Sequence, residues 1–511
     1  MRWYAGWAAY DRRLRGRYRR PMGHFIDGAV ASGDTQGRAE VRDPATDEVI
    51  AEIDIGGPVE IDRAVAAAKK AFRGWSHTPP GERSAILLRW SQELATRAEE
   101  YARVESRQAG KPIRLAREFD IPGTIDNVAF FAGAARNLEG KASAEYSADH
   151  TSSIRREPVG VVGSVSPWNY PLQMAAWKIL PAVAAGNTIV LKPAENTPLT
   201  SVMFAEAAAV AGMPRGVVNV VVGTGVVAGA ALLRHSDVDM VSFTGSTRVG
   251  RTVLEAAATT IKRVHLELGG KAPFVVFDDA DLDAAIHGAV AASLINCGQD
   301  CTAATRAIVH RSLHDRFVDG VADLYRVVRI GPTSDPATDL GPLISQAHRE
   351  RVAGIVERAR GYARVVTGGR VPDGFDRGAY YEPTLIASVT PGTEAFTDEI
   401  FGPVLTVTPF DDDDAAIAMA NDTAYGLAAS AWTRDVYRAL RATSDIRAGC
   451  VWVNDHIPII SEMPHGGLKS SGFGKDMSTY SLDDYTVVKH VMFDRRAQAE
   501  KSWHRTVFTT A

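Results

Sequence analysis

The hydrophobic pattern of the chain alternates between short apolar runs and longer alanine-rich stretches. The apolar runs are rich in β-branched residues and predict buried strands, whereas the stretches between them predict helices. Buried parallel strands separated by helices predict an α/β, doubly wound architecture. We expect one such sheet before about Leu268 and a second after it. The expected strands are residues 159–165, 188–191, 238–243, 272–277 and 404–410, and the expected helices are residues 61–72, 83–106, 200–211 and 281–294.

Three segments depart from this rhythm. Residues 146–158 and 484–493 alternate polar and apolar positions, which predicts a protruding strand pair used for assembly. Residues 216–233 carry no charge and reach the lower length limit of a spanning helix. Their four glycines and β-branched start predict instead a buried strand, a turn and the start of a helix, so we expect no membrane span.

Composition narrows the class of protein. The 511 residues contain 57 Lys and Arg against 61 Asp and Glu, so no global positive field favours nucleic acid or an acidic membrane. Only three cysteines occur, which excludes a disulfide framework and fits a cytoplasmic protein. Residues 1–20 hold seven arginines and one acid. We interpret residues 1–21 as a disordered or non-native extension, with Met22 as an alternative start to Met1.

Cys301 is the first candidate for chemistry. It lies in a glycine-containing loop after the predicted helix 281–294, where a thiol can reach the edge of a cleft and act as a nucleophile. A buried structural cysteine is the alternative interpretation. Cys297 lies four residues earlier, but no second Cys/His cluster with ligand spacing follows. We therefore predict no metal site.

Two further polar residues suit acid–base and oxyanion chemistry. Glu267 is flanked by leucines and followed by two glycines. Apolar surroundings raise the pKa of a carboxyl group towards the range of a general base, although a surface glutamate is the alternative. Asn169 lies in a turn between Pro167 and Pro171, from which its amide can donate a hydrogen bond to a developing oxyanion.

Nucleotide-binding features are present but weak when taken alone. Lys192 and Glu195 follow a strand, where a doubly wound fold binds the ribose and adenine half of a nucleotide. Residues 243–247 form a strand-to-Gly/Ser turn that can donate backbone N–H groups to a pyrophosphate. No strict G-x-G-x-x-G follows; Gly223, Gly225 and Gly229 approximate it only loosely.

Taken together and in order, six motifs are specific. They resemble the NAD(P)-dependent aldehyde dehydrogenase superfamily, and the resemblance covers about residues 22–493. The motifs are Pro167-Trp168-Asn169, Lys192-Pro193-x-Glu195, Phe243-Thr244-Gly245-Ser246, Glu267-Leu268-Gly269-Gly270-Lys271, Gly298-Gln299-x-Cys301 and Glu399-Ile400-Phe401-Gly402-Pro403.

The resemblance implies roles for four catalytic residues. Cys301 matches the nucleophile that forms a thiohemiacetal and then a thioester, and Glu267 matches the base that activates the hydrolytic water. Asn169, with the Cys301 backbone N–H, matches the oxyanion hole, and Lys178 matches a lysine on the proton-release side of the site.

The resemblance also implies a dinucleotide site. NAD is expected rather than NADP, because a glutamate at the Glu195 position contacts the adenosine ribose and disfavours a 2′-phosphate. The implied cofactor-binding residues are Val165, Pro167, Trp168, Asn169, Lys192, Pro193, Ala194, Glu195, Gly225, Gly245, Ser246, Thr247, Val249, Leu268, Glu399 and Phe401.

The domains expected from the resemblance follow the same order. Residues 22–142 and 159–267 form the NAD-binding domain, residues 268–475 the catalytic domain, and residues 143–158 and 476–497 an oligomerisation β element. Family members commonly assemble through such an element, so we expect a homodimer or homotetramer.

Four further segments resemble one subgroup of this superfamily. Residues 298–303, 461–467, 471–478 and 484–488 look like those of the bacterial γ-aminobutyraldehyde dehydrogenases. This likeness implies oxidation of 4-aminobutanal to 4-aminobutanoate in putrescine or polyamine degradation. The same-family alternatives are betaine aldehyde, succinic semialdehyde and aromatic aldehydes; the alternative of another class is a catalytically silent scaffold protein.

A protonated amino-aldehyde needs an aliphatic or aromatic tunnel and a counter-charge. Tyr170 and Trp177 match tunnel aromatics of relatives. Two departures weaken specificity for betaine aldehyde: Ile295 stands where plant amino-aldehyde relatives carry Trp, and His465 stands where relatives often carry a large aromatic residue. The candidate counter-charges are Asp120, Asp126, Asp300 and Glu462, of which Asp300 and Glu462 are the predicted substrate ligands.

Overall fold

The computed structural model describes residues 21–33, 35–140 and 142–509. The expectation for residues 1–20 therefore lies outside the described residues. Met22 is described and buried, and its backbone donates to Glu52 O at 2.8 Å and accepts from Asp54 N at 3.0 Å.

The first large sheet is parallel in its centre and antiparallel at both edges. Its order reverses direction between β7 and β10, as in a doubly wound fold. In spatial order its strands are β19 (Gly472–Phe473), β11 (Arg263–Glu267), β10 (Met240–Thr244), β7 (Val161–Val165), β8 (Thr188–Lys192), β9 (Val218–Val220), β1 (His24–Ile26) and β2 (Ala29–Ala31).

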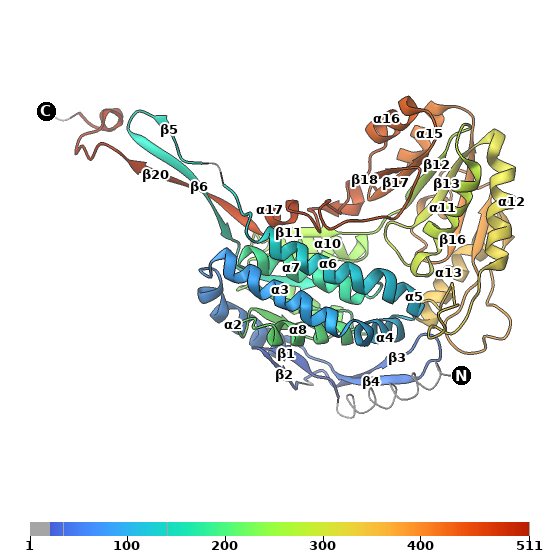
Figure 1. Cartoon of the computed structure of the whole chain (residues 1–511), viewed down its shortest axis with the longest axis horizontal. Helices are drawn as coiled ribbons and strands as arrows, with labels where there is room; N and C mark the ends of the chain where they lie inside the picture. Colours follow the sequence, from blue (N-terminus) through green and yellow to red (C-terminus); the bar gives the residue numbers. More distant parts are fainter. Residues whose placement is uncertain (1–20, 34, 141, 510–511) are drawn as a thin grey trace.

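The second large sheet is parallel except at β14. In spatial order its strands are β14 (Arg364–Thr367), β15 (Thr384–Ala387), β16 (Val404–Phe410), β13 (Ala304–His310), β12 (Ala272–Val276), β17 (Ala428–Trp432) and β18 (Cys450–Val453). The chain passes from the first sheet to the second between β11 and β12, as the sequence predicts, and returns to the first sheet only at β19 (Figure 1).

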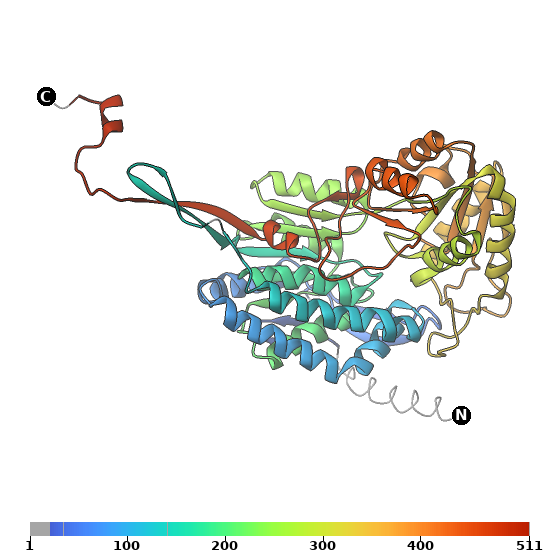
Figure 2. The same cartoon turned by 45° about the horizontal axis from the view of Figure 1, so that its top comes forward.

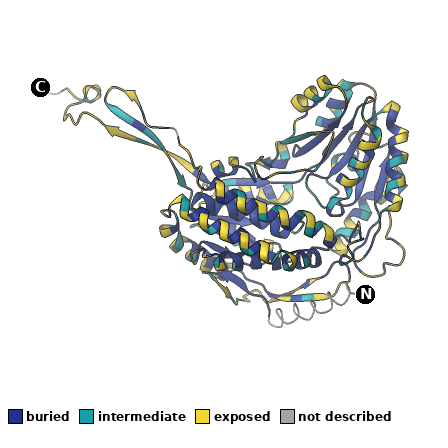
Figure 3. Ribbon diagram, viewed as in Figure 1, coloured by how far each residue is buried: buried dark blue, intermediate teal, exposed yellow. Residues whose placement is uncertain are grey.

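Helices cover both faces of each large sheet (Figure 3). Those of the first are α2 (Pro58–Trp75), α3 (Pro80–Thr96), α4 (Ala98–Ala109), α5 (Ile113–Leu115), α6 (Ile121–Ala134), α7 (Pro171–Ala185), α8 (Leu199–Val210), α9 (Ala230–Arg234) and α10 (Thr247–Ala258), with π-helical turns η1 (Ala116–Asp120) and η2 (Gly225–Gly229). Those that follow are α11 (Leu282–Leu294), η3 (Ile295–Gly298), α12 (Arg311–Val327), α13 (Gln346–Ala359), α14 (Glu394–Thr397), α15 (Asp413–Asn421), α16 (Val436–Asp445), η4 (Lys469–Ser471), α17 (Tyr480–Asp484) and η5 (Ser502–Thr506).

Successive residues of the central strand β7 pack into different cores. Val161 shares a core with Ile61 of α2, whereas Val162 shares another with Ile179 of α7. Side chains of a strand alternate between the two faces, so this pattern requires a helix layer on each. It confirms the doubly wound architecture. It also explains why the sequences of such strands are continuous apolar runs rather than alternating polar and apolar residues.

A small sheet extends away from the two large ones (Figures 1 and 2). It contains β6 (His150–Pro158), which pairs antiparallel with β20 (Thr486–Asp494) over its whole length and with β5 (Ala144–Ser147) near its start. The predicted strand pair is therefore present, with β5 as an addition. A separate hairpin joins β3 (Arg38–Arg42) to β4 (Val49–Asp54).

The single helix predicted over residues 83–106 is wrong, because it divides at Arg97. That residue leaves the α region (φ −112°, ψ 15°), ends α3 and begins α4. The new direction brings Tyr101 against α8, where its hydroxyl donates to Met203 O at 2.8 Å. Residues 216–233 form a strand and a short helix as predicted, and among the helices of the described ranges none combines the length and apolar character that crossing a bilayer requires.

Candidate active site

The carboxyl ends of four parallel strands meet at one edge of the first sheet. Val165 of β7 lies opposite Lys192 of β8, and Thr244 of β10 lies opposite Glu267 of β11. The chain leaves each strand at this edge, where the order of the sheet reverses between β7 and β10. Doubly wound folds bind their ligands in the crevice at such a switch point.

The loop after α11 brings Cys301 to this crevice. Asn296, Cys297 and Gly298 adopt left-handed backbone angles in succession (φ 48°, 59° and 69°), which turns the chain sharply. Hydrogen bonds hold the turn: the Gln299 side-chain oxygen accepts from Ile344 N at 2.9 Å, and the Asn296 amide donates to a backbone carbonyl at 2.8 Å, that of residue 169.

A cavity of about 260 Å³ lies along this edge, with Cys301 in its wall. One end of the cavity is lined by residues of the strand ends and of α13, and the other by α7 and the loop before His465. At the first end lie Pro167, Trp168, Thr244, Gly245, Ser246, Leu268, Gly269, His348, Arg351, Glu399 and Phe401; at the second lie Phe119, Tyr170, Gln173, Met174, Trp177, Ile457, Ile459 and His465, with Asn169, Asp300 and Thr302 beside Cys301.

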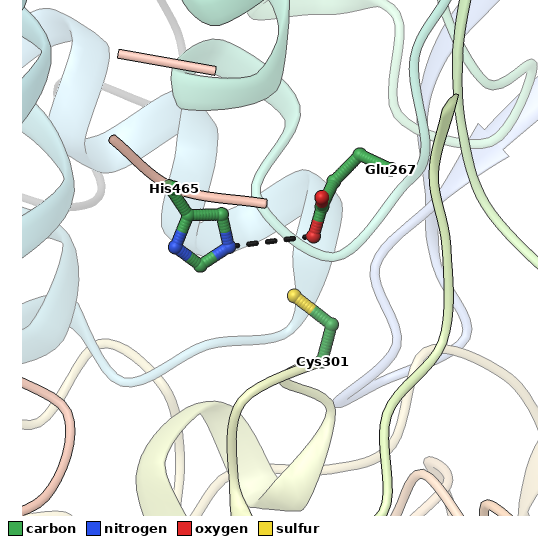
Figure 4. Close-up of side chains that lie close together, drawn as sticks. All are labelled: Glu267, Cys301 and His465. Carbon is green, nitrogen blue, oxygen red and sulfur yellow. Dashed lines mark ion pairs between the residues drawn. The ribbon is translucent and has the colours of Figure 1, made fainter. Parts of the chain in front are cut away.

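Three reactive side chains, those of Cys301, Glu267 and His465, lie close together (Figure 4). Cys301 Sγ, a Glu267 carboxylate oxygen and a His465 ring nitrogen all lie within 4.8 Å of one another. Glu267 is buried, and neither of its carboxylate oxygens accepts a hydrogen bond from the described residues. Its nearest cationic partner is His465, whose Nε2 lies 3.4 Å from Oε1. A carboxylate left open in this way can take a proton from a thiol or from a bound water.

The surroundings keep the Cys301 thiol protonated at rest. Burial raises its pKa well above the ordinary value, and the nearby carboxylates of Asp300, Glu267 and Glu399 raise it further. The thiolate is the reactive form. A base next to the sulfur is therefore a requirement of nucleophilic chemistry in this cavity.

The predicted oxyanion donor lies beside the same loop. Asn169 is buried in the turn before Pro171, the first residue of α7, and its Nδ2 donates to Gln299 O at 3.0 Å. Its amide lines the cavity next to Cys301. The role of this amide in binding an oxyanion stays a prediction.

Lys178 lies behind the cavity rather than in its lining. It is fully buried in α7, and its Nζ donates to both carboxylate oxygens of Asp476, at 2.9 and 3.1 Å. His265 Nδ1 lies 3.3 Å away on the other side. Burial raises the pKa of Asp476 to about 6, although the Lys178 ammonium opposes this shift. The structure thus places the lysine in a buried ion pair with Asp476.

Of the predicted cofactor residues, those lining the cavity are Pro167, Trp168, Asn169, Gly245, Ser246, Leu268, Glu399 and Phe401. Lys192 and Glu195 form an ion pair at the end of β8, with 3.2 Å between nitrogen and oxygen. Burial raises the pKa of Glu399 to about 7, although its carboxylate accepts a hydrogen bond from Gly270 N at 2.9 Å. The remaining predicted residues lie outside the cavity lining, on β7 or on loops and helix starts: Val165, Pro193, Ala194, Gly225, Thr247 and Val249.

Three of the four predicted substrate residues line the cavity. The Tyr170 hydroxyl donates to Asp300 Oδ2 at 2.7 Å, and Trp177 packs against the His465 ring with 5.0 Å between centroids. Glu462 does not belong to this set, because its side chain is exposed and lies outside the lining. We therefore drop it as a substrate ligand.

Two other candidate counter-charges are also excluded by position. Asp120 is fully buried in an ion pair with Lys111, 2.5 Å between nitrogen and oxygen. Asp126 accepts from Ser461 Oγ at 2.5 Å and lines a different cavity. Asp300 is thus the only one of the four that reaches the thiol cavity.

Several lining residues were not predicted. Gln173 and Met174 lie on α7 between Tyr170 and Trp177, at the helical spacing that places all four on one face, so that spacing could have revealed them. His348 packs its ring edge-on against Trp168, with 5.4 Å between centroids. No local motif marks His348, because α13 reaches the cavity only through tertiary packing.

Known proteins resemble this chain over most of its length. The model of the aldehyde dehydrogenase family matches residues 30–491. Betaine aldehyde dehydrogenase of Bacillus subtilis (strain 168) is 39% identical over 472 residues, which are 91% of this chain and 96% of that protein. The chain belongs to the aldehyde dehydrogenase family.

Solved structures agree with this assignment. An NAD+ complex of aldehyde dehydrogenase from Bacillus cereus has a TM-score of 0.92 and 38% identity, covering 94% of this chain and 98% of that one. An NAD-dependent aldehyde dehydrogenase from Sinorhizobium meliloti has a TM-score of 0.92 and 39% identity, covering 95% and 97%.

Proposed function

We propose that the protein oxidises an amino-aldehyde to the amino acid with NAD, through a thioester on Cys301. The substrate that the site suits best is 4-aminobutanal, oxidised to 4-aminobutanoate in putrescine or polyamine degradation. The observation that carries the chemistry is the convergence of Cys301 and His465, which line the cavity, with the Glu267 carboxylate. The observation that carries the substrate class is the Asp300 carboxylate beside the thiol.

The residues present fit a nicotinamide dinucleotide. Thr244 Oγ1 is buried at the cavity with no hydrogen-bond partner among the described residues, so it is free to bind a carboxamide. The N-terminus of α10, which Ser246 caps, offers backbone N–H groups to a pyrophosphate. Glu195 at the end of β8 suits a free ribose 2′-hydroxyl and repels a 2′-phosphate, which supports NAD over NADP. When bound, the nicotinamide accepts the hydride of the aldehyde.

The chain's own residues then divide the reaction into two halves. Cys301 Sγ attacks the aldehyde carbon while a neighbouring base takes its proton, and the Asn169 amide supports the charge that develops on the carbonyl oxygen. After hydride loss the acyl group is held as a thioester on Cys301. Glu267 then takes a proton from water as the water oxygen attacks the acyl carbon, and the sulfur leaves.

The far end of the cavity supports a cationic substrate tail. Its lining is aromatic and aliphatic, with Tyr170 and Trp177 among the rings, and an ammonium gains from such faces. Nearer the thiol, Asp300 adds a carboxylate that accepts from the Tyr170 hydroxyl at 2.7 Å and from the Thr302 N–H and hydroxyl, each at 2.7 Å. The one Arg or Lys in the described lining is Arg351, whose guanidinium donates to the carbonyls of Ile400 and Glu399. A substrate with a second carboxylate, such as succinic semialdehyde, therefore finds no free Arg or Lys among the described lining residues.

Betaine aldehyde is the second candidate, because one curated relative carries that name. Its trimethylammonium group cannot donate a hydrogen bond to Asp300, whereas a primary ammonium can. The aromatic lining suits both cations. The ratio of kcat/KM for the two substrates therefore measures how much the Asp300 carboxylate contributes to the preference for a primary ammonium.

Steady-state NAD reduction with 4-aminobutanal, betaine aldehyde, succinic semialdehyde and butanal tests the proposal. We expect the highest kcat/KM with 4-aminobutanal. Asp300→Asn should lower kcat/KM for 4-aminobutanal about tenfold more than for butanal, because only the amino-aldehyde loses an ion pair. One charge contact in a partly hydrated site is worth roughly 1–2 kcal/mol. A clear preference for succinic semialdehyde, or equal losses for both aldehydes, would refute the substrate class.

We also propose that the protein assembles as a homodimer or homotetramer through the small sheet of β5, β6 and β20. The long exposed stretch of β20, with Val488, Met492 and Phe493 at the surface, supports this. Exposed apolar strands at a sheet edge invite pairing with another chain.

A further inference from the structure

His465 is held rigidly in the wall of the active-site cavity. Its ring is buried, with 6% of the residue exposed, and packs on Trp177. Its backbone exchanges two hydrogen bonds with Asp476, at 2.9 and 2.7 Å. The ring therefore presents Nε2 to Glu267 at 3.4 Å, within 4.8 Å of the Cys301 sulfur (Figure 4).

Charged groups surround the imidazole from every neighbouring element. Glu267 faces it from the end of β11, Asp300 from the nucleophile loop, and Asp476 from the segment after β19. Two ammonium groups lie nearby: that of Lys178 is engaged by Asp476 at 2.9 Å, and that of Lys475 donates to Gly466 O at 2.5 Å. Burial lowers the pKa of His465, but the Glu267 carboxylate and the two aspartates raise it by more, so the net pKa is above its ordinary value. The surroundings thus favour an imidazolium ion.

The thiol needs such a cation. The carboxylates of Asp300, Glu267 and Glu399 oppose ionisation of Cys301. Once Glu267 has taken the thiol proton it is neutral, and it can accept a proton from water only after passing the first one on. A carboxylic acid in water has a pKa of about 4, whereas an imidazolium has one of about 6.5 and holds a proton near neutral pH.

We propose that His465 is the final acceptor of the Cys301 proton, which reaches it through Glu267, so that attack on the aldehyde proceeds from a thiolate–imidazolium pair. This inference rests on the proposed function, because it assigns the proton acceptor for the same thiol chemistry.

The proton and electron balance is simple. The Cys301 S–H bond breaks, and its proton passes to Glu267 and on to His465 Nε2, which leaves Glu267 ionised. The sulfur electron pair forms the S–C bond, and the carbonyl π pair moves to the aldehyde oxygen. His465 lines the cavity and releases the proton to its water. In hydrolysis the proton of the attacking water follows the same path.

Alkylation of the free enzyme by iodoacetamide tests this inference without aldehyde or dinucleotide. The rate is followed from pH 6 to 10, with peptide mass spectrometry separating Cys301 from Cys297 and Cys450. His465→Phe keeps the aromatic packing on Trp177, and His465→Gln keeps an N–H donor but accepts no proton. Both should slow Cys301 alkylation at pH 7 about tenfold and move its midpoint up by about one pH unit.

Controls make the outcome decisive. His348→Phe changes the other histidine of the lining and should leave the alkylation profile unchanged. Glu267→Gln with His465→Gln should be no slower than Glu267→Gln alone, because the path runs through Glu267. A parent-like profile in either His465 variant, the same shift in His348→Phe, or additive losses in the double variant would overturn the inference. Failure of the parent enzyme to oxidise any aldehyde would instead refute the proposed function and leave the alkylation result intact.

Discussion

Cys297 and Cys301 lie four residues apart in one loop, but their surroundings differ. Cys297 is buried, its Sγ donates to Gly341 O at 3.3 Å, and burial raises its pKa to about 12. Cys301 lines the cavity beside Glu267 and His465. A nucleophile must reach both its substrate and a base, and only Cys301 does so.

Replacing each cysteine by alanine tests this difference. Cys301→Ala should lower the rate of aldehyde oxidation at least about 1000-fold, since removal of a catalytic nucleophile abolishes covalent chemistry. Cys297→Ala should stay close to the parent rate. Initial rates of NAD reduction measure both variants, and an active Cys301→Ala would refute the covalent mechanism.

Glu195 is expected to set the choice of dinucleotide. Its carboxylate is half-exposed and balances the buried Lys192 ammonium at the end of β8. Glu195→Gln removes the charge that repels a 2′-phosphate. The ratio of kcat/KM for NAD over that for NADP should fall about tenfold, the effect of one charge pair at a distance of a few ångströms. An unchanged ratio would show that another group discriminates between the ribose 2′-hydroxyl and a 2′-phosphate.

Local sequence identified much of the site but not all of it. Cys301, Glu267 and Asn169 stand in motifs whose residue types suggest their chemistry. The structure brings Cys301 and Asn169 to one cavity and the Glu267 carboxylate close to the Cys301 sulfur. Glu462 was misplaced because residues 461–467 enter the cavity through His465, while Glu462 points outward. His348 was missed because no pattern within α13 shows what that helix packs against.

At the scale of the element, one sharp turn determines where the nucleophile lies. Gly298 has φ 69°, and a Cβ on it would lie 2.1 Å from Gly402 O. Only glycine fits both the angle and the space. The sequence could predict a glycine-containing loop here. It could not predict the turn's partner, because Gly402 lies about one hundred residues further along the chain.

Gly298→Ala should therefore destabilise the fold by roughly 2–4 kcal/mol and lower activity, because the backbone at Gly298 or at Gly402 must move to make room for the Cβ. Gly74→Ala is the matched control: Gly74 lies in α2, a Cβ there meets nothing within 4 Å, and the change should stabilise by about 0.5–1 kcal/mol. Urea unfolding measures both. Equal stability of the two variants would contradict the role given to the turn.

The boundary between α3 and α4 also depends on contacts that are distant in the sequence. The apolar period of residues 83–106 predicts one helix, yet Arg97 divides it because Tyr101 turns towards α8. The central strands were predicted well, because burial on both faces leaves a signal that needs no knowledge of neighbours.

On the scale of the whole molecule, the small sheet has little contact with either core. β6 and β20 pair along their full length and extend away from the rest of the chain (Figure 2). Such a sheet has few apolar partners of its own, and small sheets need another layer to be stable. A second copy of this chain can supply that layer.

Light scattering at micromolar concentration should accordingly report a dimer or tetramer. Replacing exposed Val488 and Met492 of β20 by lysine should lower the mass towards that of the 55.0 kDa chain, since charges on a strand face oppose pairing. A monomer in the parent protein would contradict the proposed assembly.

The most direct test of the central claim is to trap the acyl group on the thiol. The Glu267→Gln variant, which attacks the aldehyde more slowly and lacks the base for hydrolysis, is incubated with NAD and 4-aminobutanal until NADH formation stops and is then digested for mass spectrometry. We predict a burst of about one NADH per active site and a Cys301 peptide heavier by the aldehyde less two hydrogens. A burst with Cys301 unmodified, or with the acyl group on another residue, would contradict the account.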